Sequence, residues 1–428
     1  MHGKKIKTTT ESFFWAVKWN FIEAVLYQLL FVAHQTALFY CITPSMFGVV
    51  GSLFGIMYVV VTLLVAGSDG ALTPYFSTFN KDRIAFSSFL QLYAKRQLYF
   101  MSMALIVSVV GIHLSQTYGN LSEHKTILLL VVLILSAASE AIKKIVRYLL
   151  QLCFENKATT LYELVGITSY IVMVWGWYWY KGAFSLLSLF VPFLISSVVV
   201  VCLIITRVIH YARQLPVDPD SEPITHLPSR LLSVQALVTV NQYGRTLFSG
   251  NVIVPVFALY AGAAQAGFAS FANAVTHTAT FFIQKLSVPP GAALLTRVQS
   301  DSQESHHKAL RTILLLGHVL VMVSCIGICL YGLVKRPLLQ KMDTQAVFLF
   351  GFFFFIHVLE NLFMIYEKYF LIKNKTGLLV ALNGASLGLC SLLWYMHLPF
   401  FAFIMGCFLT RLSLLFILNR LVFAKKHL

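Results

Sequence analysis

Residues 185–206 read SLLSLFVPFLISSVVVVCLIIT and carry no charged side chain. An α-helix needs about 20 consecutive apolar residues to cross the hydrocarbon core of a bilayer. The stretch therefore predicts a membrane-spanning helix. Its length and its complete lack of charge separate it from the helices of a soluble core.

The whole chain has the same character. Of its 428 residues, 58% are hydrophobic and 11% are charged, against about 45–50% and about 25% in soluble domains. A soluble fold of this composition would expose large apolar patches, which a bilayer accepts as a matching solvent. We therefore treat lipid as the medium in which the chain folds.

Windows of about 20 residues find twelve apolar segments along the chain. They are residues 13–42, 45–65, 98–114, 126–149, 160–180, 185–206, 231–260, 267–283, 314–334, 346–370, 377–396 and 401–422. We predict an all-α polytopic membrane protein of about twelve transmembrane helices.

The basic residues orient these helices. The chain has 32 Lys and Arg against 16 Asp and Glu, a formal charge of +16. If the N-terminus is cytoplasmic, 23 of the 32 basic residues fall in cytoplasmic loops and 5 on the opposite side. Cytoplasmic loops of membrane proteins carry such an excess. The bias predicts a multi-pass protein of the cell inner (plasma) membrane with both termini cytoplasmic, and it explains the charge without a nucleic-acid partner.

A proline-rich connector divides the segments into two sets of six. Residues 211–228 contain four prolines and read as an extended cytoplasmic linker. We predict an N-terminal six-helix bundle over residues 1–210 and a C-terminal six-helix bundle over residues 229–428.

A shift of 218–219 residues relates the two halves. The matched pairs are Phe47-Gly48 with Ala266-Gly267, Tyr148 with Tyr366, Asn156-Lys157 with Asn374-Lys375, and Gly166 with Gly384. Because six is even, both bundles should have the same orientation, with pseudo-symmetry about an axis along the membrane normal. A central inter-lobe cavity is expected near the midplane.

The start of the chain resembles a known family. The first segment opens FFWAVKWN at residues 13–20, and TPSMFG at residues 43–48 leads into the second. These resemble the opening of Wzx-type polysaccharide (O-antigen) flippases of the multidrug/oligosaccharidyl-lipid/polysaccharide exporter superfamily.

The resemblance implies a bilobed, V-shaped transporter of lipopolysaccharide biosynthesis. Such a protein would flip an undecaprenyl-diphosphate-linked oligosaccharide from the cytoplasmic to the outer leaflet by alternating access. Its first, seventh and eighth spans would be among those lining the cavity. Polysaccharide polymerase and chain-length proteins would be candidate partners.

Polar residues inside the predicted spans give the candidate site. An ionisable group at a helix centre costs about 2.5–3.5 kcal/mol or more in lipid, so it should face protein or a wet cavity. Helical spacing places several polar residues on shared stripes. The substrate-binding candidates are Arg245, Asn241, Gln242, Asn273, His277, Asn20 and Tyr27, and the proton-coupling candidates are Glu23, His34 and Glu360.

Arg245 has the chemistry to bind a diphosphate. Its guanidinium stays ionised and can make paired charge-assisted hydrogen bonds to phosphate oxygens. The alternative is a structural pair with Glu23 or with carbonyl groups. For Arg411, the corresponding structural pairing would be with Glu360. In the fourth segment, Glu140 and Lys144 are four residues apart, and the charged lower half of that helix is expected to form a solvated face.

Other classes are less well supported. Membrane polysaccharide polymerases and ligases usually carry catalytic residues on a sizeable outward loop, and the outward connectors here are short. The sequence has no phosphate loop, zinc motif or nucleophile elbow. We expect no catalytic residue, no metal and no cofactor. A multidrug or cation exporter of the same superfamily and a membrane-embedded polymerase or ligase remain the alternatives.

The topology can be tested by cysteine accessibility. Single cysteines introduced at Ser122 and Thr344 should react with an impermeant reagent added from outside. Those at Ser87 and Ser302 should react only after permeabilisation, because their loops carry the excess of basic residues. Labelling of the Ser302 position from outside would contradict the predicted orientation.

Overall fold

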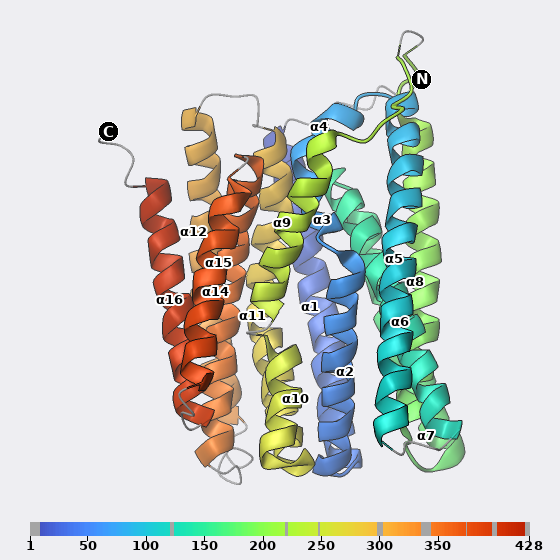
Figure 1. The fold of residues 1–428 in the computed structure, drawn as a ribbon, viewed down its shortest axis with the longest axis vertical. Coiled ribbons are helices and arrows are strands. Elements are labelled where there is room, and N and C mark those ends of the chain that lie inside the picture. The colour runs from blue at the N-terminus through green and yellow to red at the C-terminus, as the bar shows by residue number, and fades with distance from the viewer. Residues whose placement is uncertain are drawn as a thin grey trace. The chain divides into compact units, whose positions relative to one another are not determined.

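The computed structural model describes residues 9–119, 124–218, 221–246, 249–297, 303–334, 344–373, 375–395 and 400–423. Within these ranges all regular elements are helices (Figure 1). The all-α fold class predicted from the sequence is therefore confirmed.

The helices follow the predicted segments in order. In the first half they are α1 (Thr9–Cys41), α2 (Pro44–Val65), α3 (Ser68–Ala71), η1 (Thr73–Tyr75), α4 (Phe76–Phe79), α5 (Arg83–Gly119), α6 (His124–Leu152), α7 (Asn156–Lys181) and α8 (Leu186–Gln214). In the second they are α9 (Ser229–Thr246), α10 (Gly250–Ala261), α11 (Ala263–Arg297), α12 (Gln303–Val334), α14 (Thr344–Ile372), α15 (Thr376–Tyr395) and α16 (Phe400–Phe423). By length and composition, seven helices of the described residues are able to cross a membrane.

The predicted single span over residues 231–260 is wrong in one respect, because the structure divides it into α9 and α10. Ser249 has extended backbone angles, and its hydroxyl donates to the carbonyl of Thr246 at 2.7 Å. This bond satisfies an acceptor that the end of α9 leaves free. Gly250 then begins α10 directly against Asn273, where a Cβ atom would overlap the amide.

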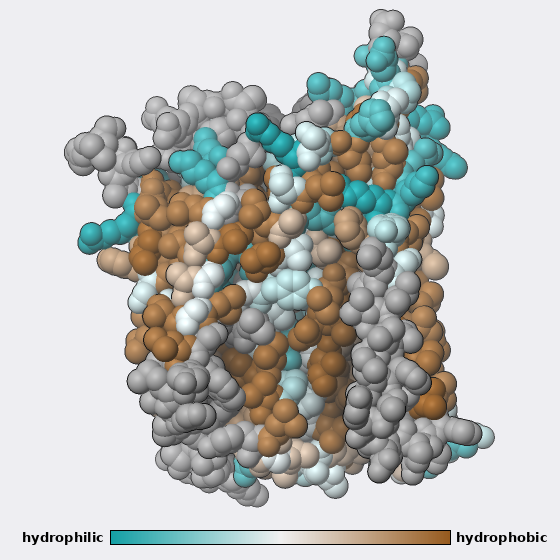
Figure 2. All heavy atoms as spheres, viewed as in Figure 1, coloured by the Kyte–Doolittle hydropathy of each residue, from teal (hydrophilic) through white to brown (hydrophobic). Residues whose placement is uncertain are grey.

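Large apolar side chains cover the outside of the helices. Trp179 is 91% exposed, Leu259 90% and Leu315 67%. Figure 2 shows that apolar residues make up most of the described surface on the face drawn. Water would not accept this much apolar surface, so the exposed side chains fit a lipid environment.

The chain forms two compact units. Unit 1 comprises Met1–Ile42 and Leu53–Thr239, and unit 2 comprises Thr43–Ser52 and Val240–Leu428. The unit boundary lies inside α9, and the first turns of α2 group with the second half. The predicted domains 1–210 and 229–428 stay a prediction.

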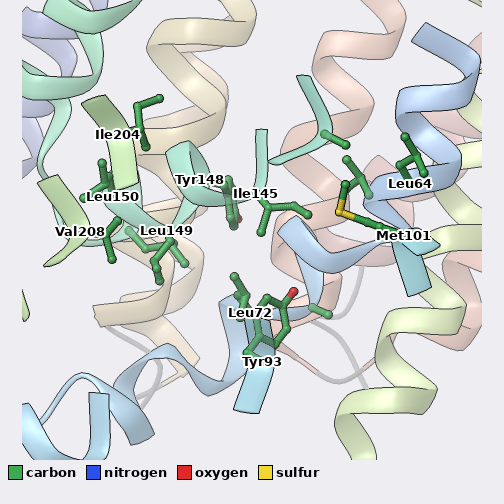
Figure 3. Packing of buried hydrophobic residues seen from close by; sticks show 14 of the residues in the cluster. Leu64, Leu72, Tyr93, Met101, Ile145, Tyr148, Leu149, Leu150, Ile204 and Val208 are labelled. Atoms are coloured by element: carbon green, nitrogen blue, oxygen red, sulfur yellow. The ribbon is translucent and has the colours of Figure 1, made fainter. Parts of the chain in front are cut away.

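In unit 1, α7 packs on α1 and α8, and α6 packs on α8. The core gathers apolar side chains from α2, α5, α6 and α8 and from the short helices after α2. Figure 3 shows Leu72 and Tyr93 beside each other and Ile145 and Tyr148 on one turn of α6. The Tyr148 hydroxyl shares a 2.7 Å hydrogen bond with Thr73. Polar atoms in this core are thus matched locally.

The predicted linker is docked on unit 1. The Ser221 hydroxyl donates to Asp82 at 2.7 Å, and the Arg83 amide donates to the carbonyl of Pro216 at 2.9 Å. Asp82 also caps α5 by accepting from the amides of Ile84 and Ala85, both at 2.8 Å. The Ala85 amide and the Ser221 hydroxyl hold the pKa of Asp82 below its usual range. The linker and the start of α5 therefore form one hydrogen-bonded corner.

In unit 2, α11 packs on α10, α12 and α14, and α16 packs on α14 and α15. The pairs α14·α16, α15·α16 and α14·α15 correspond in chain order to α6·α8, α7·α8 and α6·α7 of unit 1. These three helix pairs therefore recur in each half, as the predicted repeat requires.

The first turns of α2 approach the backbone of α11 within unit 2. A Cβ atom on Gly48 would overlap the carbonyl oxygen of Ala263, and one on Gly267 would overlap that of Pro44. Gly48 and Gly267 are 219 positions apart, and so are Pro44 and Ala263. The contact is thus reciprocal, as across a two-fold axis.

Gly51 extends this contact. It faces Ser270, which is also 219 positions away. Each of these two residues meets its own counterpart, as residues on a symmetry axis do. The contact therefore has the register predicted from the sequence.

The close approach predicts opposite effects of one substitution at two glycines. Gly48→Ala should destabilise the protein by about 1–3 kcal/mol, because the backbone it meets cannot move aside. Gly388→Ala, in α15 with open space around it, should be neutral or stabilising, since alanine favours a helix by up to about 1 kcal/mol. Amounts of monodisperse, detergent-extracted protein would measure both. Equal amounts of the two variants would contradict the close approach of α2 to α11.

Candidate functional site

Unit 1 contains a buried network of charges centred on Arg147 of α6. The guanidinium donates to Glu163 of α7 at 2.7 Å and to Glu23 of α1. Lys143, one turn earlier, pairs with Glu140 at 2.5 Å and lies 3.8 Å from Glu163. Three helices are thereby joined by ionic hydrogen bonds.

The solvated face expected on α6 is wrong. Glu140 is 6% exposed and Glu163 4% exposed. Ser197 of α8 donates to Glu140 at 2.7 Å. The face is buried because α1 and α7 place carboxylates opposite Arg147, which sequence spacing on α6 alone does not reveal.

Asn20 and Tyr27 lie on the same helix as Glu23. Asn20 is fully buried and accepts a 2.9 Å hydrogen bond from the amide of Asn156 in α7. Tyr27 is partly buried and stacks on Phe31, with ring centroids 6.3 Å apart. The contact made by Asn20 joins α1 to α7, so its amide has a structural partner.

His34 has a fixed tautomer in this arrangement. The indole N–H of Trp175 donates to its Nδ1 at 3.1 Å, so Nδ1 must be unprotonated. The ring is 2% exposed and packs edge-on against Tyr170 at 5.1 Å. A second proton on His34 would require the bond from Trp175 to break.

Unit 2 contains a second buried network. Arg411 of α16 binds Glu360 of α14 through two bonds, at 2.7 and 3.0 Å. Its third contact is a 2.5 Å bond to the side-chain oxygen of Asn383 in α15. The structural pairing of Arg411 with Glu360 considered from the sequence is therefore observed.

Arg411 fixes the direction of the remaining bonds. A guanidinium only donates, so Asn383 must turn its oxygen toward Arg411 and its N–H₂ toward Asn241. Asn241 of α9 accepts this bond and is left with its own amide N–H₂ buried and without a hydrogen-bond partner. The last group of the network is therefore the amide N–H₂ of Asn241, a hydrogen-bond donor on α9.

Asn273 and His277 meet a histidine from another helix. Asn273 shares a 2.9 Å hydrogen bond with His357 of α14. The rings of His277 and His357 are 5.3 Å apart and nearly perpendicular. His357 was not among the predicted site residues, and the packing of α14 on α11 brings it to both of them.

Arg245 lies in α9, but its side chain is outside the described residues. Its backbone is four residues beyond Asn241, which places both on one helical face. Gln242 is 2% exposed. The described contacts of Glu23 are with Arg147, so the alternative pairing of Arg245 with Glu23 is not needed to neutralise that carboxylate.

The structure thus distributes the predicted residues over the two units. Those in unit 1 are Asn20, Glu23, Tyr27 and His34, and those in unit 2 are Asn241, Gln242, Arg245, Asn273, His277 and Glu360. Within unit 2, Asn241 and Glu360 share one network. Arg147, Glu163 and Asn383 were not predicted as site residues.

Ionisable or amide side chains within apolar segments are the signal that could have found these three. Within the described ranges, no group of three His, Cys, Asp or Glu side chains is placed to hold a metal ion.

No protein-family model matches the chain, and no curated protein sequence matches it. Solved structures of MATE transporters do share its fold. An outward-facing multidrug resistance MATE transporter of the MOP superfamily has a TM-score of 0.61 and 14% identity, over 99% of this chain and 98% of that one. A variant of the Vibrio cholerae MATE transporter VcmN has a TM-score of 0.60 and 12% identity, over 97% and 99%.

A third structure, a MATE protein in complex with MaD3S, has a TM-score of 0.60 and 13% identity, over 98% of this chain and 97% of that one. The likeness spans nearly the whole length of each chain. The protein therefore has the two-lobe helical fold of these transporters.

The unit 2 network predicts a specific rescue. Arg411→Ala should lower the amount of folded protein, because an unpaired buried Glu360 costs about 3–5 kcal/mol. Adding Glu360→Gln should restore much of that amount by removing the stranded charge.

Arg207→Ala is the matched control, since Arg207 pairs with Glu155 at 2.7 Å in a partly exposed site. Exposed pairs contribute about 0–1 kcal/mol. The measurement is extracted monomer in thermal-shift assays. An Arg411→Ala protein as abundant and stable as the Arg207→Ala protein would rule out the structural role.

Proposed function

We propose that this protein is a membrane transporter that flips a polyprenyl-diphosphate-linked oligosaccharide from the cytoplasmic to the outer leaflet by alternating access. Three observations support the proposal. The fold is shared with transporters along the whole chain. The opening residues resemble lipid-linked oligosaccharide flippases. Four buried carboxylates, on α1, α6, α7 and α14, have cationic partners.

The pairing of the carboxylates is the observation that carries the substrate class. Glu360 is bound by Arg411, Glu23 and Glu163 by Arg147, and Glu140 by Lys143. A carboxylate already matched by a guanidinium attracts an organic cation only weakly. This favours an anionic substrate over the cationic drugs of a multidrug exporter.

Arg245 is the proposed ligand of the diphosphate. A permanently charged guanidinium presents two parallel donors to phosphate oxygens. The buried amide N–H₂ of Asn241, whose oxygen accepts from Asn383, adds a donor one helical turn away on α9. Together they suit an oxyanion better than a cation.

The two networks suit a transporter in another way. Alternating access is largely a rigid-body motion of one bundle against the other. The network of Arg147 lies within unit 1 and that of Arg411 within unit 2. Neither network needs to break for such a motion, so each unit can keep its internal packing through the cycle.

Proton coupling through Glu23, His34 and Glu360 remains a prediction. In the arrangement described, Glu23 and Glu360 hold guanidinium groups and His34 accepts from Trp175. Protonating Glu23 or Glu360 would remove the negative charge that its guanidinium partner is paired with, and a second proton on His34 would break the bond from Trp175. A proton carried by these residues would therefore be coupled to a local rearrangement.

Deleting the gene tests the function directly. The proposal expects lipid-linked oligosaccharide to accumulate in the membrane, identified by mass spectrometry, together with loss of surface polysaccharide. Reintroduced Arg245→Ala should not restore transport at normal membrane abundance. Arg245→Lys should restore only part, since an ammonium cannot reproduce the planar fork.

Arg230→Ala serves as the control, because Arg230 is exposed at the start of the same helix. Greater drug sensitivity with unchanged lipid intermediates would instead indicate a cation exporter. Accumulation of flipped but unpolymerised oligosaccharide on the outer leaflet would indicate a polymerase or ligase. Full transport by Arg245→Ala would eliminate its binding role.

A further inference from the structure

A groove runs along the surface of unit 2 between α12, α14 and α16, which neighbour one another in Figure 1. It encloses about 430 Å³. Buried leucines, Leu314 and Leu362, lie along it, and its other apolar lining residues are more exposed. These are Leu315, Leu412, Leu415 and Phe416.

The groove is lined by helices that are long and apolar enough to cross a membrane. Leu315 belongs to the candidate span Lys308–Ile326, and Phe416 to the candidate span Met405–Val422. Their side chains are 67% and 59% exposed. An apolar groove open on the outside of membrane-spanning helices is accessible to hydrocarbon chains, and water is a poor occupant for it.

Polar groups gather at one end of the groove. The Tyr366 hydroxyl donates to Asn419 at 2.9 Å, and Arg311 is exposed two turns from His318 on α12. In the predicted topology α12 begins and α16 ends on the cytoplasmic side, so Arg311 and Asn419 mark the cytoplasmic end. His318 and Leu412 lie deeper.

A second guanidinium stands at the same end. Arg420 follows Asn419 on α16, and its guanidinium carbon is 5.1 Å from the ring centroid of Phe416, which lines the groove. Arginine side chains of this kind keep an apolar stem in lipid and a charged head at the phosphate level. The groove therefore combines an apolar channel with two cationic groups near the cytoplasmic headgroups.

We propose that this groove binds the part of the polyprenyl chain next to the diphosphate of the lipid-linked substrate, with the diphosphate at Arg311 and Arg420. The inference rests on the proposed function and adds to it a loading site on the outside of unit 2. The substrate would be held here before its headgroup reaches Arg245. Tail and headgroup would then be recognised by different parts of the chain.

Charge and chain number favour this occupant over a bilayer phospholipid. Two guanidinium groups match the two phosphates of a diphosphate, and each can bind a phosphate through paired hydrogen bonds. A phospholipid carries one phosphodiester and two chains, of which a single groove can take only one. The polyprenyl diphosphate has one chain and the larger negative charge.

The test uses the full-length protein in nanodiscs and a photoactivatable polyprenyl diphosphate probe. Cross-linked peptides should map to α12 and α16. Leu315→Trp should fill the groove and reduce labelling at least about fivefold. Val319→Trp is the matched control, since Val319 is 50% exposed one turn along α12 and does not line the groove. It should label like the wild type.

Charge is tested in parallel. The Arg311→Gln/Arg420→Gln variant should lose labelling to a similar extent, and excess phosphatidylglycerol should compete poorly with the probe. Equal competition by phosphatidylglycerol would show a general lipid site and overturn the proposal. So would labelling that maps elsewhere, or equal labelling of Leu315→Trp and Val319→Trp.

The gene-deletion result separates this proposal from the proposed function. If the deletion strain accumulates lipid-linked oligosaccharide and Leu315→Trp restores normal transport and labelling, only the groove assignment is wrong. If the deletion changes no lipid intermediate and the wild-type protein binds no probe, both are wrong. Thermal stability of Leu315→Trp equal to that of Val319→Trp shows that lost labelling is not lost folding.

Discussion

A charge in the interior of a bilayer needs a partner, because neither water nor lipid supplies one there. This constraint organises both halves of the protein. Arg147 holds two carboxylates from two other helices, and Arg411 holds one carboxylate and one amide. Each group of helices is thus held together by hydrogen bonds with which water does not compete. These bonds are directional, whereas the apolar surfaces of the helices pack equally well against lipid.

The two networks occupy related places while their chemistry differs. Glu23 of α1 and Asn241 of α9 are 218 positions apart, within the register of the repeat. In unit 1 the arginine comes from α6, whereas in unit 2 it comes from α16. The networks therefore join corresponding helices in each half, but the arginine that joins them lies on a different helix in each.

Part of the fold and of the candidate site was predictable from the sequence, and part depended on which helices pack together. Pairing of Arg411 with Glu360 could be considered because each charge interrupts an apolar segment and must find a partner. The buried face of α6 was misread because its charged residues also suit a solvated helix. The residues that bury this face, Glu23, Glu163 and Ser197, lie on three other helices. The break before Gly250 was missed, although polar residues such as Arg245 and Ser249 interrupt the apolar run there, because the contact of Gly250 with Asn273 is tertiary. Asn383 was missed because a single amide within an apolar segment is a weaker signal than a charge.

The reciprocal contact between α2 and α11 has an evolutionary consequence. A surface in which one residue meets its own counterpart is what a homodimer forms across its dyad. A six-helix ancestor with a glycine at the place of Gly48 would have made this contact twice from one gene, and any substitution would have been felt on both sides. In a single chain that carries both halves this restriction does not apply, and the axial positions here differ, with glycine at residue 51 and serine at residue 270.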